Sequence, residues 1–181
     1  MSNWFETVSS DRPFKNDFFS VRVDEVSMPD GSTGSRSVVE HVGAVAIVPL
    51  MDDGTVVLLR QYRHAIGGYA IEIPAGRLDV AGEDVEAAAH RELVEEIGHQ
   101  AGRLRPLGTF HNSVGWTDEV THLFVASQLQ GALRPADFTL QGEEADMEIL
   151  RLPMDVCLEM IQDGAITDAK TVIGLLRAPR Q

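Results

Sequence analysis

The sequence predicts a domain of the α+β class, and three observations support this prediction. The chain has 181 residues, enough for one ordinary domain with a substantial core. Apolar residues make up 44% and charged residues 24%, which is the balance of a globular protein. Strand patterns fill most of the first hundred residues, a strong helix follows, and further strands precede two final helices.

The first strand signals lie near the amino terminus. Residues 18–28 (FFSVRVDEVSM) alternate roughly between apolar and polar side chains, PDGSTGS is a turn cluster, and RSVVEHV follows it. This pattern predicts a β-hairpin. The turn cluster is the one feature that suggests a boundary, and we divide the chain into an amino-terminal strand region, residues 1–42, and a main domain, residues 43–181.

The next segments have the composition of buried strands. Residues 43–51 (GAVAIVPLM) and 55–62 (TVVLLRQY) are continuous apolar runs joined at DDG. They predict a second hairpin whose strands are buried on both faces. Residues 68–76 (GYAIEIPAG) predict a further short strand that ends at Pro74.

Residues 83–98 (EDVEAAAHRELVEEIG) predict the clearest helix. The segment is rich in Ala, Glu and Leu, begins with acidic residues that favour a helix amino terminus, and closes at Gly98. Its apolar residues recur at helical spacing and should face the core. They are Val85, Ala89, Leu93 and Ile97.

The remaining elements complete the α+β order. Strand patterns occupy residues 104–113 and 119–129, and a third one, MEILRLP, ends at Pro153 after a long loop. Residues 154–164 and 167–178 predict two helices. Cys157 lies in the apolar stripe of the first and is expected to be a core residue.

Charge and cysteine content limit the classes of partner. The net charge of −13, from 15 basic and 28 acidic residues, argues against nucleic-acid binding, which depends on clustered Lys and Arg. Small phosphorylated ligands remain compatible, because a divalent metal ion neutralises both an acidic site and an anionic substrate. Cys157 is the only cysteine, which excludes an internal disulfide and a cysteine-rich metal site.

The chain shows no membrane or secretion signal. The longest apolar run, Val42–Met51, is well short of the roughly 20 residues that span a bilayer. The amino terminus lacks a basic start followed by an apolar stretch, so it is not typical of a secretory signal. We therefore expect a cytoplasmic protein that does not bind membranes.

The helix octet RELVEEIG concentrates ionisable side chains. Glu92 and Glu96 are four residues apart and share one helix face, and Glu95 lies at its edge. A charge run on a helix is usually a solvated face, and that interpretation holds for the octet alone. Close like charges are unfavourable, however, and a hard divalent cation would compensate for them, with Arg91 holding one carboxylate in position.

Residues 71–99 (IEIPAGRLDVAGEDVEAAAHRELVEEIGH) closely resemble the signature of the Nudix hydrolases. That signature is a glycine, five residues, a glutamate, seven residues, and then Arg-Glu-aliphatic-x-Glu-Glu-x-Gly-aliphatic. Two positions depart from it: six residues separate Gly76 from Glu83, and His99 replaces the last aliphatic residue. The extra residue falls in a loop, where it costs little. The matching residues are Gly76, Glu83, Arg91, Glu92, Leu93, Glu95, Glu96 and Gly98.

The resemblance implies a fold and a metal site. The expected fold is a Nudix-type α/β/α sandwich with a mixed sheet, plus the amino-terminal β-hairpin. The expected cofactor is Mg²⁺, with Mn²⁺ as the alternative, bound by the Ala75 carbonyl, Glu92, Glu95 and Glu96. Glu83 is expected to pair with Arg91, and both residues are expected to be structural rather than catalytic. The other expected structural residues of the motif are Gly76 and Gly98.

Outside the motif, the chain resembles the ADP-ribose and ADP-sugar pyrophosphatase branch of that family. LLRQYRH, HNSVGWTDE, GEEADMEI and GAITDAKTVIGLLRA lie where such enzymes have related segments, so the resemblance covers residues 38–178. Val114 stands where this branch commonly has proline, which weakens the choice of ADP-ribose over another nucleotide sugar.

Substrate contacts carry over from this branch to four residues. Arg63 is expected to bind a substrate phosphate, and Arg60 to share that role. The alternative for both arginines is that they cap a strand end. Glu72 is expected to contact the nucleotide, and Glu119 the region of the terminal ribose or the metals.

The catalytic residues implied by the resemblance are Glu96, which binds a catalytic metal, and the general base on the GEEAD loop. We prefer Glu143 over Glu144 as that base. A base on a loop can close over bound substrate and exclude bulk water.

These residues imply Mg²⁺-dependent hydrolysis of ADP-ribose or a related nucleoside-diphosphate sugar, a small-molecule substrate, to a nucleoside monophosphate and a sugar phosphate. Hydrolysis of GDP-sugars, dinucleotides or oxidised nucleoside triphosphates is the alternative. A non-catalytic nucleotide-sensing module is a second alternative, although such modules usually lose the motif glutamates. The branch also implies a homodimer, in which strands within residues 17–42 cross to the partner.

Overall fold

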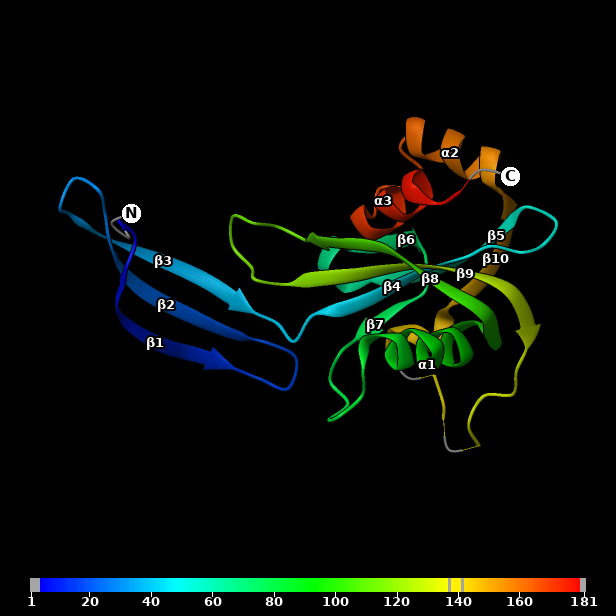
Figure 1. Ribbon diagram of the computed structural model, residues 1–181, viewed down its shortest axis with the longest axis horizontal. Helices are drawn as coiled ribbons and strands as arrows, with labels where there is room; N and C mark the ends of the chain where they lie inside the picture. The colour runs from blue at the N-terminus through cyan, green and yellow to red at the C-terminus, as the bar shows by residue number, and fades with distance from the viewer. Residues whose placement is uncertain (1–3, 137, 141, 180–181) are drawn as a thin grey trace. The chain divides into compact units, whose positions relative to one another are not determined.

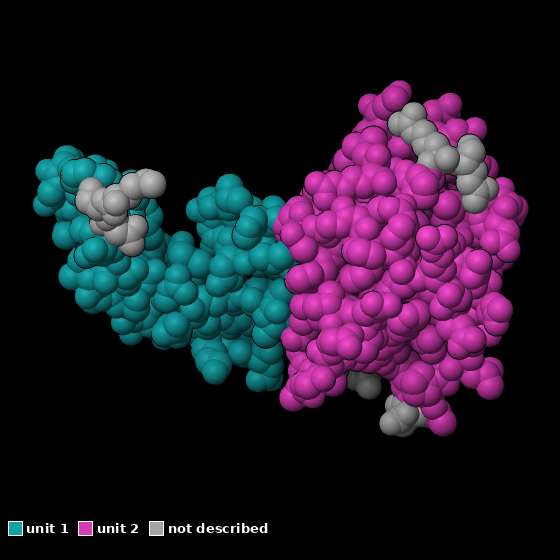
Figure 2. Space-filling view, in the orientation of Figure 1, with its two compact units in different colours: residues 1–43, 111–120 teal, residues 44–110, 121–181 magenta. Residues whose placement is uncertain are grey.

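The structure is a computed structural model that describes residues 4–136, 138–140 and 142–179; the side chains of Glu143 and Glu144 lie outside the described part. The chain divides into two compact units, coloured separately in Figure 2. Unit 1 consists of Met1–Gly43 and His111–Val120. Unit 2 consists of Ala44–Phe110 and Thr121–Gln181.

Unit 1 contains a three-stranded antiparallel sheet in the order β1-β2-β3. The predicted hairpin is present as β2 (Ser20–Ser27) and β3 (Thr33–Glu40). The sequence analysis missed β1 (Thr7–Lys15), which pairs with β2. Every residue of β1 is exposed, so the strand lacks the apolar alternation that reveals a half-buried strand.

Ion pairs tie the exposed strand β1 to its neighbours. Glu40 of β3 accepts from Arg12 of β1 at 2.7 Å and from Arg22 of β2 at 2.6 Å. These hydrogen bonds, with Arg12 the largest cause, lower the pKa of Glu40 to about 2. Polar side chains therefore supply cross-strand interactions where β1 offers few apolar ones.

Unit 2 contains a mixed sheet in two parts. The order β7-β4-β9-β8 describes one part and β10-β5-β6 the other. Strand β4 pairs parallel with β9 and antiparallel with β7. The strands are β4 (Ala44–Pro49), β5 (Thr55–Arg63), β6 (Gly68–Glu72), β7 (Ala75–Arg77), β8 (His99–His111), β9 (Val120–Gly131) and β10 (Glu148–Pro153).

Helices cover both faces of these strands, which confirms the predicted α/β/α sandwich (Figure 1). Helix α1 packs on one face, and α2 and α3 pack on the other. No described helix has the length and apolar character to cross a membrane. The helices are α1 (Val85–Ile97), α2 (Met154–Gln162) and α3 (Ala169–Arg177), with short 3-10 turns η1 (His64–Ile66) and η2 (Gly142–Asp146).

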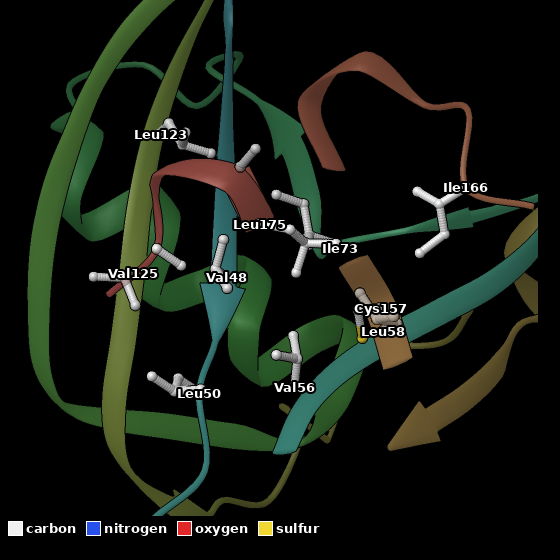
Figure 3. Packing of buried hydrophobic residues seen from close by; sticks show 12 residues of the cluster. Val48, Leu50, Val56, Leu58, Ile73, Leu123, Val125, Cys157, Ile166 and Leu175 are labelled. Atoms are coloured by element: carbon white, nitrogen blue, oxygen red, sulfur yellow. The ribbon is translucent and has the colours of Figure 1, made fainter. Parts of the chain in front are cut away.

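The alternation of β4 explains the two cores. Val45 and Ile47 point to the core shared with α1, whereas Val48 points to the core shared with α2 and α3. Figure 3 shows Val48 within this second core, together with Leu175 of α3 and Cys157 of α2. Cys157 is fully buried, as the sequence predicts.

The predicted second hairpin is wrong in its pairing. The runs 43–51 and 55–62 do form strands joined at a turn, but β4 and β5 are not neighbours in a sheet, and an isolated bridge joins Leu50, the residue after β4, to Val56 of β5. Both edges of β4 are occupied, by β7 and β9, so β5 pairs elsewhere. The short strand expected to end at Pro74 is present as β6, which ends at Glu72, and the sequence analysis missed β7, which follows Pro74 and lies in the other part of the sheet.

Helix α1 begins and ends at capping residues. The Asp84 side chain accepts a hydrogen bond from Ala87 N at 2.7 Å. Gly98 has φ 64°, the left-handed conformation that favours glycine at a helix end. Arg134 donates to the carbonyl oxygens of Glu95 and Glu96 at 2.7 and 2.8 Å, so a cation also stabilises the carboxyl end.

Candidate active site

The acidic face of α1 is buried rather than solvated. Glu92 and Glu96 are only 8% and 7% exposed, which excludes the interpretation of the charge run as a solvated face. Glu96 Oε2 accepts a hydrogen bond from Ala75 N at 2.9 Å. Buried carboxylates are costly unless they are paired and hydrogen-bonded, so the surroundings of these two side chains must compensate for their charge.

Gly76 provides the space for one of these carboxylates. A Cβ atom at residue 76 would lie 1.9 Å from Glu92 Oε1 and 2.0 Å from Glu92 Cδ. No side chain fits there unless Glu92 moves. The strand β7 and the helix α1 are therefore in contact at the position of the motif glycine.

Arg91 supplies positive charge to this acidic face. Its Nε and Nη2 atoms each lie 3.0 Å from a Glu83 carboxylate oxygen, the pairing expected for these two residues. Its Nη1 donates to Glu92 Oε1 at 2.6 Å and to Glu95 Oε2 at 3.0 Å. Burial lowers the pKa of Arg91, but the hydrogen bond to Glu83 and the neighbouring charges outweigh burial and raise it.

The donor set suits a hard divalent cation. Carboxylate oxygens are the ligands that Mg²⁺ prefers, and this ion usually binds one or two of them while it keeps several waters and contacts substrate phosphate. Among the described residues, no three acidic, His or Cys side chains are gathered around a common point. Glu92 and Glu95 instead bind the Arg91 guanidinium, so a metal ion would share these carboxylates with Arg91.

A second charged cluster surrounds Glu72 at the end of β6. Arg63 Nε and Nη2 donate to the two oxygens of Glu72 at 2.6 and 2.8 Å, and Lys170 Nζ also donates to Glu72 Oε2. Burial raises the pKa of Glu72, but Arg63 and Lys170 outweigh burial and lower it to about 2. Glu72 is therefore an ionised, buried carboxylate held by two cations.

The EIPAG segment, residues 72–76, connects the two clusters. Its first residue binds Arg63 and Lys170, its Ala75 N–H donates to Glu96, and its Gly76 faces Glu92. The hydrogen bond to Glu72 is the main cause that raises the pKa of Arg63, and the charge of Glu96 adds to it. The structure thus brings Arg63 and Glu72 together with the carboxylates of α1 in one site.

Arg60 has a different environment. Its guanidinium carbon lies 3.8 Å from the centre of the Tyr69 ring, and its Nη1 lies 3.3 Å from Glu148. The Tyr69 hydroxyl donates to Asp146, the last residue of η2, at 2.6 Å. Arg60 therefore links its strand, the central strand β5, to β6 and β10 through side-chain contacts, and its role in substrate binding stays a prediction.

Three further residues were predicted to belong to the site, namely Glu119, Glu143 and Glu144. Glu119 belongs to unit 1, where its carboxylate lies 3.5 Å from His41 Nδ1. Glu143 and Glu144 belong to η2, but their side chains are among those that the structure does not describe. Their expected roles stay predictions.

The sequence analysis missed Lys170 and its neighbours. Lys170 and Thr171, in the first turn of α3, contact Glu72 and Ile73, about a hundred residues earlier in the chain, and Asp168 binds both Lys170 and Thr171. The one local signal was Asp168, an acidic residue at a helix start, which indicates an N-cap but not a site.

Comparison with known proteins identifies the family. The family model described as NUDIX domain matches residues 40–168. The chain therefore belongs to the NUDIX domain family. The model described as nucleoside diphosphate sugar hydrolase N-terminal domain matches residues 5–39, which include β1, β2 and most of β3.

Individual relatives match most of the chain. The ADP-ribose pyrophosphatase of Mycobacterium tuberculosis is 39% identical over 172 residues, which cover 95% of this chain and 82% of the relative. The methanol dehydrogenase activator of Bacillus methanolicus is 34% identical over 177 residues, which cover 97% and 94%. A crystal structure described as an ADP compounds hydrolase superposes with a TM-score of 0.81 at 22% identity, over 96% of this chain and 91% of that one, and it supports the fold.

Proposed function

We propose that this chain catalyses the Mg²⁺-dependent hydrolysis of ADP-ribose or a related nucleoside-diphosphate sugar to a nucleoside monophosphate and a sugar phosphate. Membership of the NUDIX family and the ADP-ribose pyrophosphatase among the relatives support a hydrolase of this class. The observation that carries the proposal is the EIPAG segment, which joins buried acids on α1 to the Arg63–Glu72 pair. This arrangement offers sites for a cation and for an anionic substrate side by side.

The acids of α1 are proposed to hold the metal. Glu92, Glu95 and Glu96 would bind it together with the Ala75 carbonyl oxygen. When bound, Mg²⁺ neutralises phosphate charge and lowers the pKa of a coordinated water. Arg91 and Gly76 keep Glu92 in place, and Ala75 N–H orients Glu96 through its hydrogen bond.

Arg63 is proposed to bind a substrate phosphate. Glu72 holds its guanidinium by two parallel hydrogen bonds, which fix the plane of the fork. The Arg63 side chain is still 39% exposed, so a phosphate oxygen can approach it. A fixed guanidinium loses little conformational entropy when it binds an anion.

Glu143 is proposed as the general base, with Glu144 as the alternative. Its function would be to accept a proton from the attacking water. The backbone turn η2 that carries both residues ends at Asp146, which binds the Tyr69 hydroxyl. Glu119 and Arg60 are retained as further proposed substrate contacts.

A homodimer formed through unit 1 is also proposed. Strand β1, the residues before it and the loop that joins it to β2 expose large apolar side chains, which are unfavourable in water and typical of interaction surfaces. Sedimentation analysis of the purified chain should give twice the monomer mass of 19.8 kDa. A monomer at micromolar concentration would contradict the proposal. The exposed side chains are Trp4, Phe5, Val8, Phe14, Phe18 and Phe19.

A substrate panel tests the proposed activity. ADP-ribose, a GDP-sugar, a dinucleotide and an oxidised nucleoside triphosphate are incubated with the protein and Mg²⁺, and products are separated by chromatography. We expect AMP and ribose 5-phosphate from ADP-ribose as the fastest reaction. Release of pyrophosphate from the triphosphate as the main reaction, or no turnover of any substrate, would contradict the proposal.

A further inference from the structure

The first turn of α3 binds the carboxylate that orients Arg63. Lys170 Nζ donates to Glu72 Oε2, and the same ammonium donates to Asp168 Oδ1 at 2.9 Å. The Lys170 side chain is 18% exposed. Lys170 is therefore a second cation, besides Arg63, that binds the carboxylate of Glu72.

Hydrogen bonds fix the place of Lys170 in the fold. Asp168 Oδ2 accepts from Thr171 N at 2.9 Å and from Thr171 Oγ1 at 2.6 Å. Thr171 Oγ1 accepts from Ile73 N at 2.8 Å, and both of these residues are buried. The start of α3 is thereby joined to the backbone next to Glu72, which limits the positions that the Lys170 ammonium can reach.

The charges in this cluster balance. Arg63 and Lys170 are positive, and Glu72 and Asp168 are negative, so the four side chains together are neutral. Without Lys170 the group would carry a net negative charge close to Glu96, whose charge already acts on Arg63. An anionic substrate would then meet a less favourable potential at Arg63.

We propose that Lys170 is a positioning residue for substrate binding, which holds Glu72 in place and shares its negative charge so that Arg63 stays attractive to a substrate phosphate. The proposal rests on the proposed function, because it names a further determinant of the same substrate site. This role differs from that of a purely structural salt bridge in its effect on KM. Removal of a positive charge from the cluster should raise KM, whereas removal of a negative charge should not.

Three variants test this role. Lys170→Met removes the cation with similar length, Lys170→Arg keeps a cation, and Asp168→Asn removes the second negative charge while Asn still caps the helix. Steady-state kinetics with ADP-ribose at saturating Mg²⁺ give kcat and KM for each. Thermal unfolding is recorded for each to verify folding.

The expected results separate an effect of the Lys170 charge on substrate binding from an effect of the substitution on folding. Lys170→Met should raise KM about tenfold and change kcat by less than about threefold, since the lost interaction acts on substrate binding. Lys170→Arg should restore KM to within about threefold of the original, and Asp168→Asn should leave KM unchanged or lower it. A control substitution of the exposed Arg105 on β8, Arg105→Met, should change KM by less than about twofold.

Several outcomes would overturn the proposal. An unchanged KM in Lys170→Met, or a loss confined to kcat, would show that Lys170 does not act on substrate binding. An increase of KM in Asp168→Asn as large as that in Lys170→Met would indicate a purely structural role. If Lys170→Met does not fold, Lys170→Gln replaces it, with the same expected rise in KM, and an unchanged KM in that variant would overturn the proposal.

The activity of the unsubstituted protein distinguishes failure of the proposed function from failure of the role proposed for Lys170. If it turns over no nucleotide sugar, the proposed function fails, and the dissociation constant of ADP-ribose is then measured by calorimetry for the same variants. Weaker binding by Lys170→Met alone would support the role of Lys170 even then. Equal affinity for all variants would overturn it.

Discussion

The carboxylate of Glu92 packs directly against the Cα atom of Gly76, so closely that a Cβ at residue 76 would lie 1.9 Å from Glu92 Oε1. Gly76 is not among the glycines with positive φ. Glycine is therefore required here by the neighbouring carboxylate and not by backbone conformation. The contact links β7 to the acidic face of α1, where we propose that the metal binds.

Gly76→Ala should reduce activity more than stability. The methyl group would displace the Glu92 carboxylate, and a displacement of about 1 Å at a reacting site can cost on the order of 10² in rate. The measurement is kcat/KM for the substrate identified by the panel. Gly131→Ala is the matched control, because a Cβ there meets no atom within 4 Å, and it should retain full activity. Normal activity of Gly76→Ala would contradict the importance of the contact.

Arg91→Gln should destabilise the fold, and Mg²⁺ should restore part of the loss. The substitution leaves Glu83, Glu92 and Glu95 without their shared guanidinium, and breaking such a partly buried cluster costs about 3 kcal/mol. A cation that binds only the folded protein stabilises it by mass action. Urea unfolding with and without millimolar Mg²⁺ measures both effects.

The control for this experiment is Arg103→Gln, which removes an exposed arginine of β8 and should change stability little. An Arg91→Gln protein that is equally stable with and without Mg²⁺ would argue against a metal site beside Arg91.

Glu72→Gln should change the pH dependence of stability. Because the folded protein holds the pKa of Glu72 at about 2, below its usual 4.5, the ionised carboxylate stabilises the fold above pH 4.5. That contribution, about 3 kcal/mol, is lost as the pH falls from 4.5 towards 2. The difference in unfolding free energy between the two proteins should therefore be largest near pH 7 and shrink in acid. A difference that stays constant down to pH 3 would be inconsistent with the ionised, paired Glu72.

Arg134→Met should lower stability by about 1 kcal/mol, because two charged hydrogen bonds to the carboxyl end of α1 are lost. Denaturant unfolding measures the effect, with Arg105→Met as the control. If the two variants are equally stable, the contact of Arg134 with α1 contributes nothing in solution.

Local signals made part of the site predictable. The limits of α1 follow from Asp84 and Gly98, and the placement of Glu92 and Glu96 on one face follows from helix geometry, so residues close in sequence could be positioned. Strand β1 could not be predicted, because its side chains are exposed and the ion pair of its Arg12 is with Glu40 of β3, 28 residues later in the chain.

Long-range relationships account for the other differences. Strands β4 and β5 are separated because β7 and β9 pair with the two edges of β4. A short window of sequence does not predict which distant strands form those pairs. The contact of Lys170 with Glu72 spans 98 residues. The motif acids were thus accessible from the sequence, whereas the cluster that supports Arg63 became visible only in the fold.

The most direct test of the central proposal is Mn²⁺ binding by electron paramagnetic resonance, compared among the unsubstituted protein, Glu92→Gln, Glu96→Gln and Glu86→Gln. Glu86 is an exposed acid in the first turn of the same helix and serves as the control. We predict that Glu92→Gln and Glu96→Gln weaken Mn²⁺ binding at least about tenfold and reduce turnover on the order of 10², while Glu86→Gln changes neither. Unaltered Mn²⁺ affinity in both Glu92→Gln and Glu96→Gln would contradict the proposal that the buried acids of α1 hold the metal.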